Sequence, residues 1–317
     1  MADGSVQART PGKFTDPDVT ADGQPRAKVA LAGLETLWSN IGTLCNIECA
    51  NCYILSSPTN DALVYLTLAD VVAYLDEIRD RGLGTREIAF TGGEPFMNPE
   101  MVAMAREALE RGFEVLILTN AMRPMMRPSV RQGLLALREE FGRRLTLRVS
   151  IDHYQPRFHD AERGEGSFEI TLKGMRWLSE NGFRMSAAGR TMWGESEDDA
   201  RAGFARLFVD EGFDIDTEDP GAMVLFPEMD EAAEVPEITT ACWGILGKTP
   251  DSVMCSNARM VVKRRGAEGP TVLACTLLAY DPQFELGRTL AEAAHPVALN
   301  HPHCAKFGVL GGARCSV

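Results

Sequence analysis

Three cysteines stand within eight positions of the stretch LCNIECANCYIL, residues 44–55, and this crowding constrains the chain more than any other feature. Cys45, Cys49 and Cys52 are followed directly by Tyr53. A structural zinc site needs four ligands, usually with cysteines in pairs, but no fourth cysteine and no histidine occurs within forty residues on either side. Iron–sulfur clusters take one thiolate per iron, so three thiolates leave one iron open. The loop therefore favours an iron–sulfur cluster that binds a further ligand.

The alternation of short apolar runs with longer helical patterns over residues 33–227 predicts an α/β fold with a parallel sheet. Strands are expected at 34–42, 86–92, 113–120, 145–152, 183–191 and 222–227. Helices are expected at 68–82, 99–112, 130–142, 168–182 and 197–212, each ending at a glycine. Six βα units form either an open doubly wound sheet or an incomplete barrel. In both, ligands bind at the carboxyl ends of the strands.

The chain outside this array is expected to form two further parts. Residues 1–30 show no periodicity and predict a flexible N-terminal arm, residues 31–228 the βα domain, and residues 229–317 a smaller cysteine-rich α+β unit. A net charge of −13 disfavours a nucleic-acid partner. Without a visible signal peptide or membrane-spanning apolar run, a cytoplasmic location is expected, with no membrane partner.

A second motif, Thr91-Gly92-Gly93-Glu94-Pro95, follows the second expected strand. The pair of motifs resembles the cluster loop and the GGEP motif of the radical S-adenosylmethionine (radical SAM) superfamily. This resemblance implies an incomplete (βα)6 barrel, with a smaller cysteine-rich C-terminal α+β extension. It implies a 4Fe-4S cluster on Cys45, Cys49 and Cys52, and S-adenosylmethionine contacts from Tyr53, Gly92, Gly93, Glu94 and Pro95, the GGEP segment holding the methionyl amino group. A chance grouping of cysteines or an unrecognised zinc site is the alternative.

Polar residues at later strand ends extend this resemblance. Ser150 would reach the cosubstrate ribose and Asp152 would face the substrate, or both would cap a loop. Arg190 would pair with the cosubstrate carboxylate, or would be a solvated surface arginine. Asn120 stands in Thr-Asn-Ala, where the family often has Thr-Asn-Gly, and is expected to bind the cosubstrate.

The C-terminal cysteines resemble the auxiliary-cluster extensions called SPASM or twitch. There a cysteine starts a short hairpin, a glycine marks its turn, a second cysteine ends it and a Leu-Gly segment precedes a helix; Cys255, Gly269, Cys275, Leu286 and Gly287 occupy these places. Five residues separate Gly269 from Cys275 where four are usual. The resemblance implies an auxiliary 4Fe-4S cluster held by Cys255, Cys275, Cys304 and Cys315. His301, His303 or Cys242 could replace a ligand, and structural zinc is the alternative metal.

The implied reaction starts when the reduced cluster passes one electron to S-adenosylmethionine, and the resulting 5′-deoxyadenosyl radical takes a hydrogen atom from the substrate. We expect oxidation or rearrangement of a small natural product or a peptide, with flavodoxin or ferredoxin as electron donor. The arm shows no winged-helix-like leader-binding module, which favours a small molecule. The alternatives are an epimerase with Cys242 as hydrogen donor, a non-catalytic iron–sulfur sensor of S-adenosylmethionine, and a zinc-stabilised interaction scaffold.

Overall fold

The computed structural model describes residues 12–228 and 230–311. Its centre is a nine-stranded sheet in the order β10-β9-β8-β2-β3-β4-β5-β6-β7. The six expected strands are β2 (Thr36–Asn40), β3 (Glu87–Thr91), β4 (Glu114–Thr119), β5 (Leu145–Ser150), β6 (Arg184–Thr191) and β7 (Met223–Pro227). They pair in chain order and all in parallel. Among the described residues β7 pairs with no second neighbour, so the array is an incomplete barrel and the expected fold class is confirmed.

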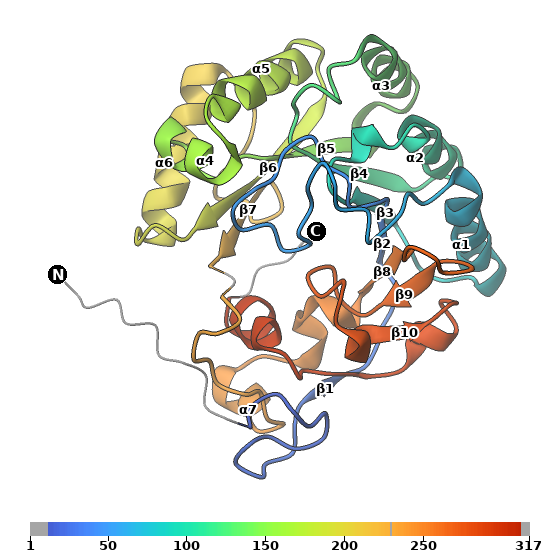
Figure 1. Ribbon diagram of the computed structural model, residues 1–317, viewed down its shortest axis with the longest axis vertical. Coiled ribbons are helices and arrows are strands. Elements are labelled where there is room, and N and C mark those ends of the chain that lie inside the picture. Colours follow the sequence, from blue (N-terminus) through green and yellow to red (C-terminus); the bar gives the residue numbers. More distant parts are fainter. Residues whose placement is uncertain (1–11, 229, 312–317) are drawn as a thin grey trace.

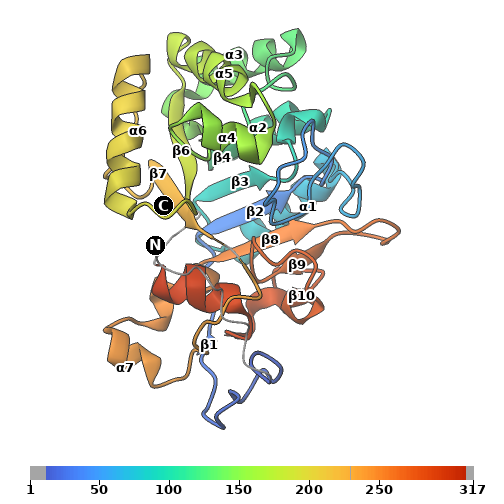
Figure 2. The same cartoon turned by 60° about the vertical axis from the view of Figure 1, so that its left-hand side comes forward.

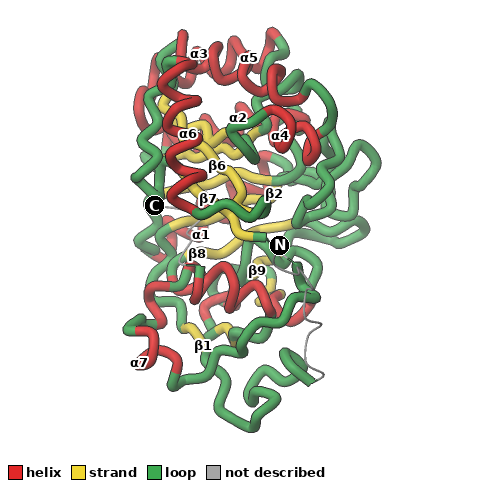
Figure 3. The backbone as a smooth tube through the Cα atoms, turned by 90° about the vertical axis from the view of Figure 1, so that its left-hand side faces the viewer, coloured by secondary structure: helices red, strands yellow, loops and turns green. Residues whose placement is uncertain are grey.

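Helices cover the outer face of this curved sheet (Figure 1). They are α1 (Leu68–Arg81), α2 (Met101–Glu110), α3 (Pro128–Phe141), α4 (Pro156–Arg163), α5 (Ser167–Glu180) and α6 (Glu197–Glu211). The side chains on both faces of the sheet are enclosed: all five residues of β2 are buried, including the polar Thr36, Ser39 and Asn40. The tube in Figure 3 shows the same layering, with helices outside the strands.

Local signals explain where the helices begin and end. Thr67 and Asp70 form a reciprocal capping box at the start of α1, and Gly82 ends the helix in the left-handed region. Helix α4 was not predicted from the sequence. It spans only eight residues, too few for a clear apolar period, although a proline opens it and Gly164, at φ 98°, follows its last residue.

The C-terminal unit continues the sheet of the barrel (Figure 2). Strand β8 (Ala258–Val262) pairs in parallel with β2, and an antiparallel hairpin leads to β9 (Thr271–Leu273) and then β10 (Glu285–Gly287). Cys255 precedes β8 and Cys275 follows β9, as the expected hairpin requires. The helix expected after Gly287 is only a 3₁₀ turn, Glu292–Ala294. The unit also contains α7 (Cys242–Leu246) and the π-helix η7 (Cys304–Leu310).

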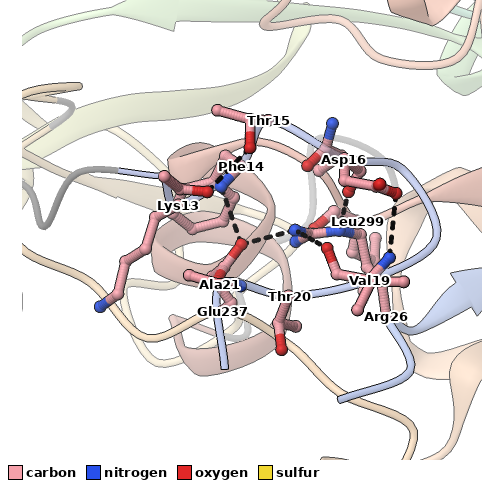
Figure 4. Close-up of polar contacts among 12 residues, drawn as sticks. Lys13, Phe14, Thr15, Asp16, Val19, Thr20, Ala21, Arg26, Glu237 and Leu299 are labelled. Atoms are coloured by element: carbon pink, nitrogen blue, oxygen red, sulfur yellow. Dashed lines mark hydrogen bonds and ion pairs between the residues drawn. The ribbon is translucent and has the colours of Figure 1, made fainter. Parts of the chain in front are cut away.

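The N-terminal segment differs from the flexible arm expected over residues 1–30. From residue 12 onward it packs on the C-terminal unit, and β1 (Lys28–Val29) pairs with β11 (Val297–Ala298). Arg26 is buried and forms an ion pair with the carboxylate of Glu237, which also accepts hydrogen bonds from the backbone N–H groups of Phe14 and Ala21 (Figure 4). The apolar content of this segment is low, so polar contacts with distant residues hold it, and local sequence does not reveal them.

No helix in the described part of the chain combines the length and apolar character needed to cross a lipid bilayer.

The Arg26–Glu237 pair gives a first prediction. Glu237→Ala leaves the Arg26 guanidinium buried without its carboxylate, so we expect a loss of about 3–5 kcal/mol in the free energy of unfolding. The double variant Arg26→Met/Glu237→Ala, which buries no charge, should recover part of this loss. Urea unfolding of the three proteins checks the prediction. A single variant as stable as the wild type would contradict it.

Candidate active site

One large cavity opens at the carboxyl ends of the parallel strands, and its empty volume is about 1090 Å³ including open solvent. Its wall brings together most of the residues predicted from the sequence: Cys45, Cys49, Cys52, Tyr53, Gly92, Gly93, Asn120, Ser150, Asp152 and Arg190. The side chains of Glu94 and Pro95 are buried behind this wall. Thr276 and Leu277 line the same cavity, so the C-terminal unit contributes to it.

The cysteine loop is held at both sides by backbone contacts. The N–H of Cys45 donates to the carbonyl of Ser57 over 3.0 Å, which closes the base of the loop. On the other side, the N–H of Ala50 donates to the carbonyl of Glu162 over 2.9 Å, and the amide of Asn51 donates to both carboxylate oxygens of Glu162 at 2.8 and 3.0 Å. Helix α4, which the sequence did not predict, therefore fixes the loop that carries the three thiols.

Burial of the Cys45 and Cys49 thiols opposes their ionisation. Burial raises the pKa of Cys45 to about 12 and also raises the pKa of Cys49, where the nearby Arg163 guanidinium works against the rise. Metal binding requires thiolates and releases these protons. Arg163 is a cation that would favour the thiolate form.

The GGEP turn meets the cysteine loop backbone to backbone. A Cβ on Gly93 would lie 2.3 Å from the carbonyl oxygen of Leu44, and a Cβ on Gly92, at φ 146°, would lie 2.5 Å from the carbonyl oxygen of Gly42. Only glycine permits this approach. The backbone of Thr91, Gly92 and Gly93 consequently faces the cavity, where carbonyl groups could accept hydrogen bonds from an ammonium.

The Glu94 carboxylate points into the protein. It accepts hydrogen bonds from the Thr119 hydroxyl at 2.9 and 3.0 Å and from the N–H of Asn120 at 2.8 Å, and so ties the turn after β3 to the end of β4. Burial raises the pKa of Glu94 to about 7, although these hydrogen bonds oppose the rise. The expected contact of this segment with an amino group is thus available from backbone carbonyls, while the carboxylate has a positioning role.

Asp152 organises two arginines on the cavity wall. Arg163, the last residue of α4, donates to both of its carboxylate oxygens at 2.7 and 3.1 Å, and the Nε of Arg190 lies 3.5 Å away. Although burial alone would raise it, these cations hold the pKa of Asp152 below its ordinary value. Sequence reasoning missed Arg163. The signal was the short helix between Pro156 and Gly164, at whose end it stands.

Two further predicted residues take defined positions. The Arg190 guanidinium stacks 4.9 Å from the centre of the Tyr53 ring and donates to the carbonyl of Asn51 over 2.6 Å. The Asn120 amide donates to Asn46 Oδ1 over 2.9 Å. Ala121, where the family often has glycine, keeps the left-handed conformation at φ 56°. The alanine therefore changes no backbone direction at this strand end.

The cavity wall contains buried polar atoms that have no hydrogen-bond partner. They are Nε1 of Trp38, Nδ2 of Asn40 and Oγ of Ser56. A buried donor without a partner costs roughly 1–3 kcal/mol. Three such atoms on one wall, beside three thiols, fit a cavity shaped for a polar ligand together with a thiolate-bound metal group.

A second, smaller cavity lies in the C-terminal unit, with an empty volume of about 440 Å³. Cys255, Cys275 and Cys304 line it together with His303 and apolar side chains, and burial raises the pKa of all three thiols. The buried Nδ1 of His303 has no hydrogen-bond partner. The three buried thiols and this orphaned nitrogen fit a metal group enclosed in the apolar core of the unit.

The two cavities share a wall. Leu277 lines both, and Phe226 from the large cavity stacks on Phe307 from the small one at a ring-centre distance of 5.2 Å. Residues 12–228 and 230–311 contain no group of three His, Cys, Asp or Glu side chains that could hold a single metal ion. Each set of three cysteines lines one cavity.

Two predicted residues remain, Cys242 and Cys315. Cys242 begins α7, accepts a hydrogen bond from the N–H of Thr239 at 3.4 Å, and does not line the large cavity. Cys315 lies outside the described residues.

The contact at Gly93 gives a second prediction. In Gly93→Ala the new Cβ would collide with the backbone of Leu44, so the GGEP turn and the cysteine loop must separate. We expect the variant to lose most of the iron that anaerobic reconstitution places on Cys45, Cys49 and Cys52. Gly84→Ala is the matched control, because no atom lies within 4 Å of its new Cβ. Equal iron contents, measured in proteins with Cys255, Cys275 and Cys304 replaced by alanine, would refute this.

Glu94 gives a prediction about pH. Its folded-state pKa of about 7 exceeds that of an unfolded glutamate, about 4.3. The protonated Glu94 carboxyl therefore stabilises the folded state fully below about pH 4. This contribution to the free energy of unfolding, on the order of 3 kcal/mol in total, is lost as the pH rises towards 7. Relative to Glu94→Gln, which cannot ionise, the metal-free wild type should lose stability over this interval in urea unfolding. Parallel pH curves for the two proteins would contradict the prediction.

Several known proteins are similar in sequence to part of this chain. The subtilosin biosynthesis protein AlbA of Bacillus subtilis is 31% identical over 154 residues, which cover 47% of this chain and 32% of AlbA. An AdoMet-dependent heme synthase of Methanosarcina barkeri is 30% identical over 140 residues, covering 44% of this chain and 37% of that protein. The chain thus matches about a third of the length of these relatives.

Solved structures share the fold at low sequence identity. AnSMEcpe with bound AdoMet superimposes with a TM-score of 0.57 at 14% identity, covering 82% of this chain and 77% of that one. Streptococcus suis SuiB bound to its precursor peptide SuiA gives 0.56 at 11% identity, covering 81% and 63%.

The sequence model of the Radical SAM superfamily matches residues 39–207, more than half of the 317 residues. The chain therefore belongs to the radical SAM superfamily, whose enzymes use a 4Fe-4S cluster and S-adenosylmethionine.

Proposed function

We propose that this protein is a radical SAM oxidoreductase or maturase that removes a hydrogen atom from a peptide and oxidises or rearranges it. The observation that carries the proposal is the large cavity, in which Cys45, Cys49 and Cys52 face the GGEP backbone and two arginines. One wall of this cavity belongs to the C-terminal unit, whose own three cysteines lie directly behind it. Radical formation and a second redox centre would therefore adjoin one substrate space.

The cysteine loop would hold the catalytic 4Fe-4S cluster, which supplies one-electron cleavage of S-adenosylmethionine and hydrogen-atom removal from the substrate. The backbone carbonyls of Thr91 and Gly92 would accept from the cosubstrate ammonium, and Arg190 would donate to its carboxylate. Tyr53, Asn120 and Ser150 line the cavity where the adenosyl part would lie. Asp152 would position Arg163 and Arg190 and so keep both cations facing the cavity.

The C-terminal cavity would hold an auxiliary 4Fe-4S cluster on Cys255, Cys275 and Cys304. Cys315 is the proposed fourth ligand, and His303 is the alternative because its orphaned Nδ1 belongs to a residue of the cavity wall. The C-terminal cavity lies behind Leu277, and this position would suit transfer of an electron from a substrate radical to the auxiliary cluster. A flavodoxin or ferredoxin would supply the electron for the catalytic cluster, in the cytoplasm.

A peptide substrate is favoured over a small natural product by the similar proteins. AlbA is a protein of bacteriocin biosynthesis, and SuiB and anSMEcpe have both been solved with a bound peptide. A small-molecule substrate is the second candidate, because one relative is a heme synthase. An epimerase that uses Cys242 as hydrogen donor gains no support, since Cys242 does not line the large cavity.

The test combines iron counting with product analysis on the anaerobically reconstituted chain. We expect about eight irons per chain in the wild type and about four in Cys45→Ala/Cys49→Ala/Cys52→Ala. With dithionite and S-adenosylmethionine, the wild type should release 5′-deoxyadenosine and the triple variant should not. Candidate peptides should increase this release, and mass spectrometry should find the modified peptide.

Each part of the proposal can fail separately. About four irons in the wild type and none in the triple variant would remove the auxiliary cluster and keep the radical chemistry. Binding of S-adenosylmethionine without any 5′-deoxyadenosine would favour a sensor. Release stimulated by small molecules and never by peptides would overturn the peptide assignment.

A further inference from the structure

Arg259 on β8 is a buried cation that donates its hydrogen bonds to neutral backbone carbonyls. The residue is 1% exposed. Its Nε donates to the carbonyl of Ala293 at 2.9 Å, and its Nη1 donates to the carbonyls of Cys255 at 2.6 Å and Ala258 at 2.8 Å. Its Nη2 is buried and has no partner. Within residues 12–228 and 230–311, no carboxylate lies within ion-pair distance of this guanidinium.

Two other buried arginines of the chain lie beside a carboxylate. Arg26 pairs with Glu237, and Arg190 lies beside Asp152. Removing an ion from water costs several kcal/mol unless an opposite charge compensates it. Arg259 therefore requires an anion that the described residues do not supply, and its position indicates where that anion would be.

The thiol of Cys255, which belongs to the C-terminal cysteine cavity, is a group beside Arg259 that can become anionic. The Arg259 guanidinium binds the backbone of Cys255, whose thiol lines that cavity with Cys275 and Cys304. A 4Fe-4S core carries a charge of 2+ when oxidised, so three or four thiolates make the whole cluster a net anion. A loaded cluster would supply the missing negative charge inside an apolar enclosure.

We propose that Arg259 is the counter-charge of the auxiliary cluster and raises its reduction potential. The inference rests on the auxiliary cluster proposed above. One-electron reduction takes the core from 2+ to 1+ and adds a negative charge, and a fixed cation in a low-dielectric core stabilises the reduced state more than the oxidised one. Arg259 is thus a positioning and tuning residue that makes the cluster a better electron acceptor.

In turnover, the substrate radical would lose one electron to the auxiliary cluster and one proton to solvent, which closes the new bond of the oxidised product. The cluster would then return the electron to a flavodoxin- or ferredoxin-type carrier. Electrons and protons balance without any other oxidant. The tuning by Arg259 concerns the first of these steps.

The test is a potentiometric titration followed by electron paramagnetic resonance. It uses the full chain with Cys45→Ala/Cys49→Ala/Cys52→Ala, so that only the auxiliary cluster gives a signal. We expect Arg259→Met to shift the midpoint to a more negative potential at unchanged iron content. Arg259→Lys retains the charge and should stay close to the parent. Arg148→Met is the matched control, because Arg148 is also buried but lies on β5, four strands away in the sheet.

The outcomes separate the two proposals. A parent triple variant without iron overturns the auxiliary cluster itself. With about four irons bound, an unchanged midpoint in Arg259→Met overturns the counter-charge role alone. If Arg259→Met does not fold, Arg259→Gln replaces it as the neutral variant that can still donate to carbonyls. Equal shifts in the Gln and Lys variants would assign the effect to lost hydrogen bonds and overturn the proposal.

Discussion

The active site depends on a contact between two backbones at the ends of β2 and β3. The N–H of Gly93 donates to the carbonyl of Gly42 at 2.8 Å, and the N–H of Glu94 donates to the carbonyl of Leu44 at 3.2 Å. No side chain fits between these segments, so the glycines are a steric requirement. Everything that follows, from the direction of the thiols to the carbonyls left facing the cavity, is set by this closeness. The Glu94 carboxylate strengthens it from behind by binding the end of β4.

Two buried acids each hold several groups around the cavity. A single carboxylate, that of Asp152, holds two cations at the wall of the large cavity, and one residue of α4, Glu162, holds the outer part of the cysteine loop. Both acids are buried, so neither can be exchanged for a neutral residue without leaving a cation or an amide unsatisfied. In the proposed function, these two acids would hold the site together without transferring a proton.

The barrel and the cysteine motifs could be predicted from the sequence because they depend on local patterns. Strands β2 to β7 have clear boundaries in the sequence. The cysteine spacing and the GGEP motif consist of residues close together in the chain, so they can be recognised without the fold. Arg163 was missed because the helix that carries it is too short to show an apolar period, and the inward turn of Glu94 was missed because its partner Thr119 lies on another strand. The ordered part of the N-terminal segment, from residue 12 onward, could not be predicted either, because its order comes from contacts with Glu237, more than two hundred residues later. The unpaired charge of Arg259 is likewise visible only once the core is assembled.

The parallel pairing of β8 with β2 has a consequence for how the two cysteine sites can move. Strand β2 leads into the first cysteine loop, and β8 starts just after Cys255, so one continuous ladder of hydrogen bonds connects the two sites. Tyr280 adds a hydrogen bond from the C-terminal unit to the carbonyl of Ile54 at 2.8 Å. Electron tunnelling rates fall steeply with distance. The shared sheet would therefore keep the distance between the two cysteine sites constant, even where the loops around the cavity change to accept other substrates.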